Sequence, residues 1–208
     1  LCDRRQRQMC IRDRSYLSMM PNMTVLAPKN DRELEEMLAF AVSFDGPIAI
    51  RYPRGSAHQG LREYQVPVEY GRSEIIRKGK KIAVLGVGSM IPSCMEICKG
   101  LKDDGYDPTF VNARFVKPLD VDLLDELAKD HSLFVTVEEN VKSGGYGEHV
   151  SAYMEACHPE IRVLSAAVWD RFVPQGNVES LRSRIGLGVE DIRQAIEDSE
   201  ELRAVSYT

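Results

Sequence analysis

Residues 82–104 read IAVLGVGSMIPSCMEICKGLKDD, and this stretch decides the fold class of the chain. The apolar run from Ile82 to Val87 has the length and composition of a buried strand. Gly86 and Gly88 then mark a tight turn, and apolar residues recur at helical spacing from Ile91 to Asp104. The stretch therefore predicts a strand, a turn and a helix that lies on the sheet, which is the repeating unit of an α/β protein.

The same alternation continues toward the C-terminus. We expect further strands at residues 109–112, 133–137 and 161–164, and further helices at residues 121–129, 146–157 and 189–196. Strands that alternate with helices in this way form a parallel sheet, because each helix returns the chain to the end at which the previous strand began. This part of the sequence therefore predicts a parallel α/β domain.

A shorter unit of the same kind precedes that domain. Residues 23–27 predict a strand, Asn30 predicts the N-cap of a helix, and residues 48–52 predict a second strand. A strand, a helix and a strand in this order indicate a parallel crossover. Residues 56–79 show only weak periodicity, and we place a linker at residues 61–71, with an edge segment of the next domain after it.

Residues 1–14 (LCDRRQRQMCIRDR) do not fit this pattern. They contain five arginines, show neither helical nor strand periodicity, and do not begin with methionine. A mitochondrial targeting peptide is also rich in arginine, but it is amphipathic and precedes the start of a domain, whereas this segment leads into the middle of one. We interpret residues 1–14 as a foreign or disordered segment and expect the pattern of the protein itself to begin at Ser15.

The composition is that of a globular protein, with 43% hydrophobic and 28% charged residues among 208. The formal net charge of −5 provides no basic field for binding nucleic acid or an anionic membrane. The longest apolar stretches are far shorter than the ~20 residues that span a bilayer. We therefore expect neither a nucleic-acid partner nor a membrane partner.

The five cysteines are an odd number and include no C-x-x-C pair, which is typical of a reduced, cytoplasmic protein rather than a secreted one. Cys94 and Cys98 lie four residues apart on a predicted helix, so they could begin a metal site or act as small buried apolar residues. No histidine or further cysteine lies close by in the sequence to complete four ligands. We expect the buried role and no metal site.

The clearest candidate for chemistry is the string Arg51-Tyr52-Pro53-Arg54-Gly55. It places two arginines at the carboxyl end of a predicted parallel strand, which is the edge where α/β sheets bind ligands. Proline and glycine would hold Arg54 on a stiff turn, and its guanidinium suits a phosphate or a carboxylate. Arginines at strand ends also form structural ion pairs, so the residues alone leave both roles open.

Two other segments allow a functional interpretation. Gly86 and Gly88 follow a strand as in a dinucleotide-binding turn, but Ile91 stands where a third glycine would be, so we favour a tight turn. Glu138 and Glu139 end a predicted strand and could act in acid–base catalysis or metal binding. Adjacent residues of a strand point in opposite directions, so we favour structural or interfacial roles for them. No catalytic triad is visible around the histidines.

Several strings carry a more specific signal through their order and spacing. They are residues 15–17 (SYL), 21–23 (PNM), 27–29 (APK), 51–55 (RYPRG), 112–120 (NARFVKPLD), 135–140 (VTVEEN) with Gly144 and Gly145, and 170–176 (DRFVPQG). From Ser15 to about Ile196 the chain closely resembles the 1-deoxy-D-xylulose-5-phosphate synthases, a branch of the transketolase family. The strings ARFVKPLD and TVEEN are the most specific, whereas the shorter ones also fit the wider family.

This resemblance implies an α/β fold in two parts. Residues 15–60 would form the end of the pyrimidine-binding domain of a thiamine-diphosphate enzyme. Residues 72–208 would form a transketolase C-terminal-type domain with three α/β/α layers. The family resemblance also implies a homodimer.

The resemblance further implies a reaction that joins pyruvate to D-glyceraldehyde 3-phosphate with loss of carbon dioxide. The cofactors would be thiamine diphosphate and Mg²⁺, and the product would serve isoprenoid, thiamine and pyridoxal biosynthesis. Arg54 matches the family arginine that contacts the substrate phosphate, and Arg51 would support it.

The chain also departs from the family. The catalytic glutamate, its aromatic neighbours and the G-D-G…N motif for magnesium and diphosphate are not found in this sequence, and Gln8 stands where a substrate-site histidine would be. We therefore assign no catalytic, cofactor-binding or metal-binding residue, and expect an incomplete synthase that neither binds the cofactor nor acts alone. The alternative is a noncatalytic C-terminal assembly subunit of a split transketolase-like enzyme, whose other half is encoded elsewhere.

Overall fold

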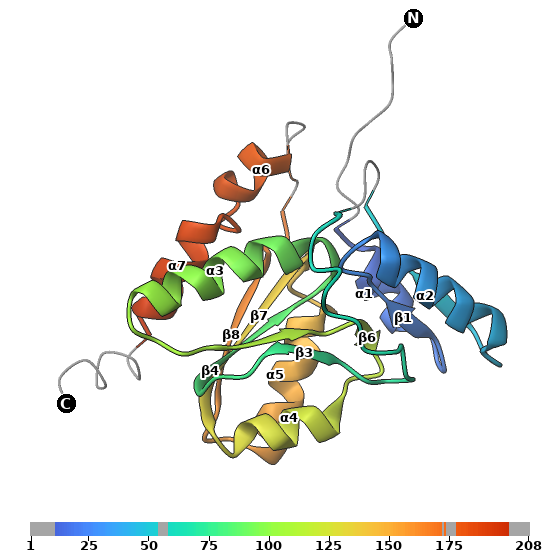
Figure 1. Ribbon diagram of the computed structural model, residues 1–208, viewed down its shortest axis with the longest axis horizontal. Helices are drawn as coiled ribbons and strands as arrows, with labels where there is room; N and C mark the ends of the chain where they lie inside the picture. The colour runs from blue at the N-terminus through green and yellow to red at the C-terminus, as the bar shows by residue number, and fades with distance from the viewer. Residues whose placement is uncertain (1–10, 54–57, 172, 174–177, 200–208) are drawn as a thin grey trace, which may run out of the picture.

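The N-terminal unit consists of α1 (Asp13–Ser18), β1 (Thr24–Leu26), α2 (Asp31–Ser43) and β2 (Ile48–Ile50). The computed structural model describes residues 11–53, 58–171, 173 and 178–199, and places this unit beside a larger α/β unit (Figure 1). The Asn30 side chain accepts a hydrogen bond from the backbone N–H of Glu33 at 2.9 Å, so it caps α2 as predicted. Strands β1 and β2 pair in parallel, which confirms the predicted crossover.

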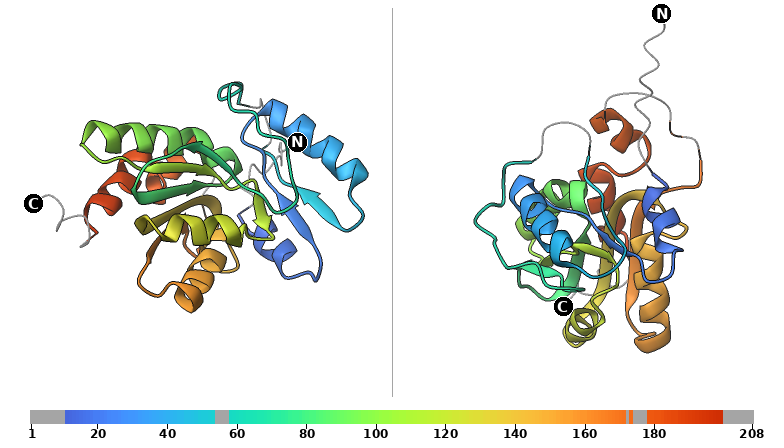
Figure 2. Two further views of the ribbon diagram at one scale, coloured as in Figure 1. Left: turned by 60° about the horizontal axis from the view of Figure 1, so that its bottom comes forward. Right: turned by 90° about the vertical axis from the view of Figure 1, so that its right-hand side faces the viewer.

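The larger unit contains β3 (Glu74–Arg77), β4 (Lys81–Gly86), η1 (Gly88–Met90), α3 (Ile91–Asp103), β5 (Thr109–Asn112), β6 (Phe115–Lys117), α4 (Val121–Ala128), β7 (His131–Val141), α5 (Tyr146–Cys157), β8 (Arg162–Val168), α6 (Val178–Arg184) and α7 (Val189–Glu197). Its sheet has the order β3-β5-β4-β7-β8, with β3 antiparallel at one edge and the other strands parallel. Helices α3 and α7 cover one face, and α4 and α5 cover the other (Figure 2). The three-layer α/β/α arrangement is therefore confirmed.

The face of α3 that meets the sheet carries the two cysteines. Cys94 and Cys98 are 0% and 4% exposed and pack in one hydrophobic core with Ile97 and Leu101. Burial raises the pKa of the Cys98 thiol to about 12, because the thiolate would lose its hydration there. Both thiols therefore act as small apolar groups, as the sequence predicts.

Periodicity does not predict four short elements of the structure, namely α1, β3, β6 and α6. Each has seven residues or fewer, and none shows a clear helical or alternating apolar pattern. Strand β3 occupies the region where an edge segment is expected. Strand β7 is longer than predicted, because it continues through Glu138, Glu139 and Asn140 to Val141.

Strand β6 connects the two units. It follows β5 in the sequence, yet it pairs in antiparallel orientation with β1 of the N-terminal unit, and Val25 lies opposite Lys117. The Lys117 ammonium group also donates hydrogen bonds to the carbonyl oxygens of Ser18 and Met20 at 2.9 and 2.7 Å. The larger unit therefore completes the three-stranded sheet of the smaller one.

A buried ion cluster joins the same two units. Lys29 and Glu33 come from the N-terminal unit, whereas Glu74, Asn112 and Arg114 come from the larger unit, and all five are at most 5% exposed. The Lys29 ammonium group lies 3.1 Å from the Glu33 carboxylate and 2.6 Å from that of Glu74. Arg114 contacts the same two carboxylates at 2.7 and 3.2 Å, and the Asn112 amide donates to both. Two cations and two anions thus balance inside the contact.

The structure places residues 11–14 against the larger unit, although the sequence shows no regular pattern there. Helix α1 begins at Asp13, and Ile11 is 6% exposed. Arg14 is fully buried, and none of its three side-chain nitrogens has a hydrogen-bond partner among the described residues. Burial lowers the pKa of the Arg14 guanidinium, because the charged form loses its hydration. The position therefore favours an apolar side chain over arginine.

We predict that Arg14→Leu raises the free energy of unfolding by about 1–4 kcal/mol, because it removes a buried cation that has no hydrogen bonds while keeping apolar volume. Urea denaturation of the two proteins under the same conditions measures the difference. Arg12→Leu, at a half-exposed arginine of the same segment, serves as the control and should change stability far less. A lower stability of Arg14→Leu would contradict this interpretation.

We also predict that Arg114→Met lowers the free energy of unfolding by about 3–5 kcal/mol, because one buried cation then remains for two buried carboxylates. Arg62→Met is the matched control, since Arg62 pairs with Asp31 at the surface and its side chain is 50% exposed. That change should lower the stability far less, because water screens an ion pair at the surface. Equal losses in the free energy of unfolding for both variants, measured by urea denaturation, would show that the cluster contributes no more to stability than a surface ion pair.

Candidate functional site

Arg51 lies directly after β2, at the carboxyl end of the strand. Its backbone N–H donates to the carbonyl oxygen of Leu26 at 2.8 Å, which continues the pairing of β1 with β2. Its guanidinium lies 3.4 Å from the Asp13 carboxylate and 3.8 Å from the Glu139 carboxylate, and the side chain is 13% exposed. Arg54, the other predicted site residue, lies outside the described residues. Arg51 is therefore fixed in ion pairs at the predicted edge of the sheet.

Glu139 is the carboxylate around which this site is arranged. One of its oxygens accepts a hydrogen bond from the Ser89 hydroxyl at 2.6 Å and faces Arg51. The other accepts from Arg182 of α6 at 2.7 Å. Burial alone would raise the pKa of Glu139, but Arg182, Ser89 and Arg51 outweigh burial and hold the pKa below its usual value. Glu139 therefore stays ionised between two arginines.

The turn after β4 brings Ser89 to this place. Gly88 has a φ of 54°, in the left-handed region, and a Cβ there would lie 2.9 Å from the Cβ of Ala27 in the N-terminal unit. A Cβ at Gly86 would lie 2.8 Å from the Sγ of Cys94. Close packing therefore accounts for both glycines, in agreement with the tight-turn interpretation.

Glu138 points to the other face of β7, as the alternation of a strand requires. Its carboxylate accepts a hydrogen bond from the backbone N–H of Gly147 at 2.8 Å, in the first turn of α5. It thereby caps a helix whose N-cap residue, Gly145, has no side chain. Burial raises the pKa of Glu138, although Arg14 and the helix N–H groups oppose the shift. The two adjacent glutamates thus have separate structural roles.

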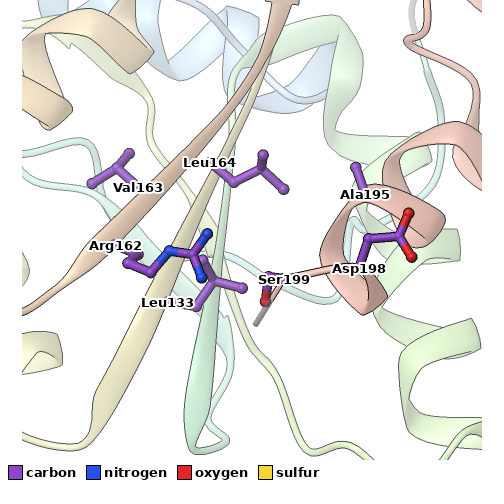
Figure 3. A pocket seen from close by; sticks show the side chains of 7 residues that line it. All are labelled: Leu133, Arg162, Val163, Leu164, Ala195, Asp198 and Ser199. Carbon is purple, nitrogen blue, oxygen red and sulfur yellow. The ribbon is translucent and has the colours of Figure 1, made fainter. Parts of the chain in front are cut away.

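A pocket of about 170 Å³ lies elsewhere in the larger unit (Figure 3). Its lining includes Leu133 near the start of β7 and Arg162 at the start of β8, together with Ala195 in the last turn of α7 and Ser199 just after that helix. Glu139 lies near the carboxyl end of β7, whereas the pocket lies near the start of that strand. The pocket is therefore separate from the candidate site.

The arrangement is a set of ion pairs rather than a site for proton transfer. Two arginines converge on one carboxylate, and the hydroxyl of Ser89 is engaged by that carboxylate, whose lowered pKa makes it a weak base. Within residues 11–53, 58–171, 173 and 178–199, no three histidine, cysteine or acidic side chains are placed to hold a metal ion. No described helix is long and apolar enough to cross a membrane.

Residues 5–59 match the family described as "Transketolase, pyrimidine binding domain", and residues 71–192 match "Transketolase, C-terminal domain". The chain belongs to the transketolase family. The first match begins inside residues 1–14, whose foreign origin stays a prediction, as do the domain limits that we place at residues 60 and 72.

Curated relatives give the same relationship. The 1-deoxy-D-xylulose-5-phosphate synthase of Lachnoclostridium phytofermentans is 44% identical over 181 residues, which cover 86% of this chain and 29% of that protein. The synthase of Dictyoglomus thermophilum is 41% identical over 185 residues, covering 88% of this chain and 30% of its own length. The chain thus spans about 30% of the length of these relatives.

Solved structures agree with the fold. A split gene transketolase, described as an inactive beta4 tetramer, has a TM-score of 0.83 and 28% identity, covering 92% of this chain and 62% of that one. Transketolase from Campylobacter jejuni has a TM-score of 0.68 at 18% identity, covering 91% of this chain and 28% of that one, which shows a shared fold alone.

Two residues of this candidate site are not predicted from the sequence. Arg182 lies in α6, whose seven residues give no clear pattern, and its carboxylate partner is 43 residues away. Ser89 stands between Gly88 and Met90. The sequence predicts only a tight turn there and assigns Ser89 no function. The position of Ser89 at the carboxyl end of a parallel strand is the signal that could have found it.

We predict that Glu138 and Glu139 titrate on opposite sides of the ordinary glutamate pKa of 4.5. The depressed pKa of Glu139 contributes stability that is present above pH 4.5 and is lost as the pH falls through the folded-state pKa. The raised pKa of Glu138 contributes stability below pH 4.5 that is lost as the pH rises through its folded-state pKa. A ¹³C NMR titration of the side-chain carboxyl groups measures both values. Shifts in the same direction would refute the assignment.

Proposed function

We propose that this chain is part of a 1-deoxy-D-xylulose-5-phosphate synthase. In this proposal residues 15–60 are the end of the pyrimidine-binding domain, residues 61–71 are a linker, and residues 72–208 form the C-terminal domain. The reaction joins pyruvate to D-glyceraldehyde 3-phosphate and releases carbon dioxide. The observation that carries the proposal is the 40–44% identity to synthases from several species over 86–88% of this chain, and the strings ARFVKPLD and TVEEN support it.

We propose that the residues of this chain do not hold the cofactor by themselves. Thiamine diphosphate, held through Mg²⁺ in the complete enzyme, supplies the electron sink for decarboxylation. The described residues offer no set of ligands for the metal ion. We therefore propose that the rest of the complete enzyme binds the cofactor and that this chain alone does not.

The contribution of this chain is to bind and orient the phosphorylated aldehyde. A guanidinium presents a planar set of N–H donors that matches two phosphate oxygens. In the proposal Arg54 contacts the substrate phosphate, and Arg51 holds the start of the turn. Fixing the phosphate end places the aldehyde carbon for bond formation, and such positioning lowers the entropic part of the barrier.

The complete enzyme is proposed to be a cytoplasmic homodimer that supplies precursors for isoprenoids, thiamine and pyridoxal. The similarity to a split gene transketolase favours a second possibility, a noncatalytic C-terminal assembly subunit. The gene distinguishes the two. A continuous reading frame upstream that encodes the catalytic glutamate and the G-D-G…N motif supports the synthase, whereas a start codon just before Ser15 supports the subunit.

We predict that Arg54→Ala, made in a complete synthase that carries this segment, raises the KM for D-glyceraldehyde 3-phosphate by roughly 10- to 100-fold. A hydrogen bond to a charged group contributes about 1.5–3 kcal/mol, and each 1.4 kcal/mol is a factor of about ten. The KM for pyruvate should change by less than about twofold, because pyruvate has no phosphate. Steady-state kinetics with each substrate varied in turn measures both constants.

Arg62→Ala is the control, since Arg62 is half-exposed and pairs with Asp31 at the surface. It should leave both KM values near those of the parent. If Arg54→Ala raises the KM of pyruvate as much as that of the aldehyde, the phosphate contact is refuted. A complete enzyme that forms no product from the two substrates would refute the proposed function itself.

A further inference from the structure

His131, the first residue of β7, belongs to a chain of hydrogen bonds at the start of the larger sheet. Its ring Nδ1 lies 2.8 Å from the carbonyl oxygen of Leu127, in the last turn of α4. Its ring Nε2 lies 2.7 Å from the hydroxyl of Thr109, the first residue of β5, and that hydroxyl oxygen accepts from the backbone N–H of Gly79 at 2.9 Å. The chain therefore joins α4, β7, β5 and the turn between β3 and β4.

The partners of the His131 ring decide which of its nitrogens carries a hydrogen. A carbonyl oxygen can only accept, so Nδ1 is the donor to Leu127. In the neutral ring Nε2 is then an acceptor, and the Thr109 hydroxyl donates to it while accepting from Gly79. Each donor in the chain thus faces an acceptor, and the geometry corresponds to one tautomer of the neutral ring.

A second proton on the His131 ring would break this arrangement at Nε2. The charged ring carries a hydrogen on both nitrogens, so Nε2 could no longer accept from the Thr109 hydroxyl. The charge would also be buried, because His131 and Thr109 are only 6% and 1% exposed. Burial lowers the pKa of His131, although the Leu127 carbonyl and Asp130 oppose the shift. The chain of hydrogen bonds is therefore complete only with the neutral ring.

The charged groups near the ring lie at the surface or face other partners. Asp130 precedes His131 in the loop from α4, Lys81 lies opposite His131 in the pairing of β4 with β7, and both side chains are exposed. Asp107, in the loop before β5, lies 3.8 Å from the guanidinium of Arg77. Both ring nitrogens contact uncharged groups, a hydroxyl and a carbonyl. A proton on the ring would therefore gain no buried counter-ion among these groups.

We propose that this chain of hydrogen bonds is a pH-sensitive lock on the larger unit, closed while the His131 ring is neutral and opened when the ring takes up a proton. The inference is independent of the proposed function, because the lock lies at the first residues of β5 and β7. The unfolded chain binds a proton near the ordinary histidine pKa of 6.5, whereas the folded chain binds it only at lower pH. The stability that the lock contributes is full above pH 6.5 and is lost as the pH falls through the folded-state pKa.

Two-dimensional ¹H–¹⁵N NMR spectra of the histidine rings of this chain test the lock without any substitution. At pH 7.5 the ring of His131 should carry its hydrogen on Nδ1, and its titration midpoint should lie below 6.5. A hydrogen on Nε2 instead, or a midpoint at 6.5 or above, would overturn the inference.

His131→Asn removes the titrating ring and keeps an amide that can donate to the Leu127 carbonyl. Urea denaturation of both proteins at pH 7.5 and 5.5 gives the unfolding constants. Between these pH values the constant of the parent should rise by up to about tenfold more than that of the variant, because a single proton is involved. His149, whose pKa burial also lowers, is present in both proteins, so its contribution cancels. The same pH dependence in both proteins would contradict the lock.

Thr109→Val tests the other end of the chain, because valine keeps the shape of threonine and lacks the hydroxyl. Its unfolding constant at pH 7.5 should rise roughly tenfold, since the hydrogen bonds to Gly79 and His131 are both lost. Thr136→Val is the matched control, at a buried threonine of β7 whose hydroxyl has no partner among the described residues. Its unfolding constant should change far less. Equal changes in the two variants would show that the Thr109 hydroxyl is not a link of the chain and would overturn the inference.

Discussion

Lys29, Glu33, Glu74 and Arg114 can be buried together because each charge meets an opposite charge at hydrogen-bond distance. Two of the four pairs, Lys29 with Glu74 and Arg114 with Glu33, cross between the units, and a displacement of one unit against the other would break both in a dry environment. The cluster therefore favours one docking geometry. The pairing of β1 with β6 requires the same docking geometry.

The candidate site depends on the same constraint. Arg51 belongs to the N-terminal unit and Glu139 to the larger one, so their approach requires correct docking. Gly88 lies beside Ala27 at the same contact. Because Gly88 has no side chain, the backbone of the larger unit can approach Ala27 more closely than a Cβ would allow. The approach of Arg51 to Glu139 therefore has its physical origin in the packing of the two units.

The longer elements could be predicted from the sequence because each buries one face, so that apolar residues recur along it at a regular spacing. Helix α3 places an apolar residue toward the sheet at each turn, and Asn30 indicates the start of α2 because its side chain can cap the helix. The short strands β3 and β6 could not be predicted, since their positions depend on partner strands that are distant in the sequence. The partner of β6 is in the other unit, which no local pattern can indicate.

The site was only partly predictable for a similar reason. The sequence places arginines at a strand end, and strand alternation correctly separates Glu138 from Glu139. It does not show that Glu139 turns toward two arginines, because Arg51 and Arg182 approach it from distant segments. Arg14 illustrates the reverse case, since a charged residue gave no sign in the sequence that it would be buried.

The pairing of β1 with β6 also has a consequence for the order of folding during synthesis. Val25 meets Lys117, a residue that the ribosome adds about 90 residues later. Until then the edge of β1 remains open, and closing so long a loop is slow. The N-terminal unit therefore cannot finish folding when its own last residue leaves the ribosome. Its sheet is completed only after the first half of the following domain, which includes β6, has been synthesised.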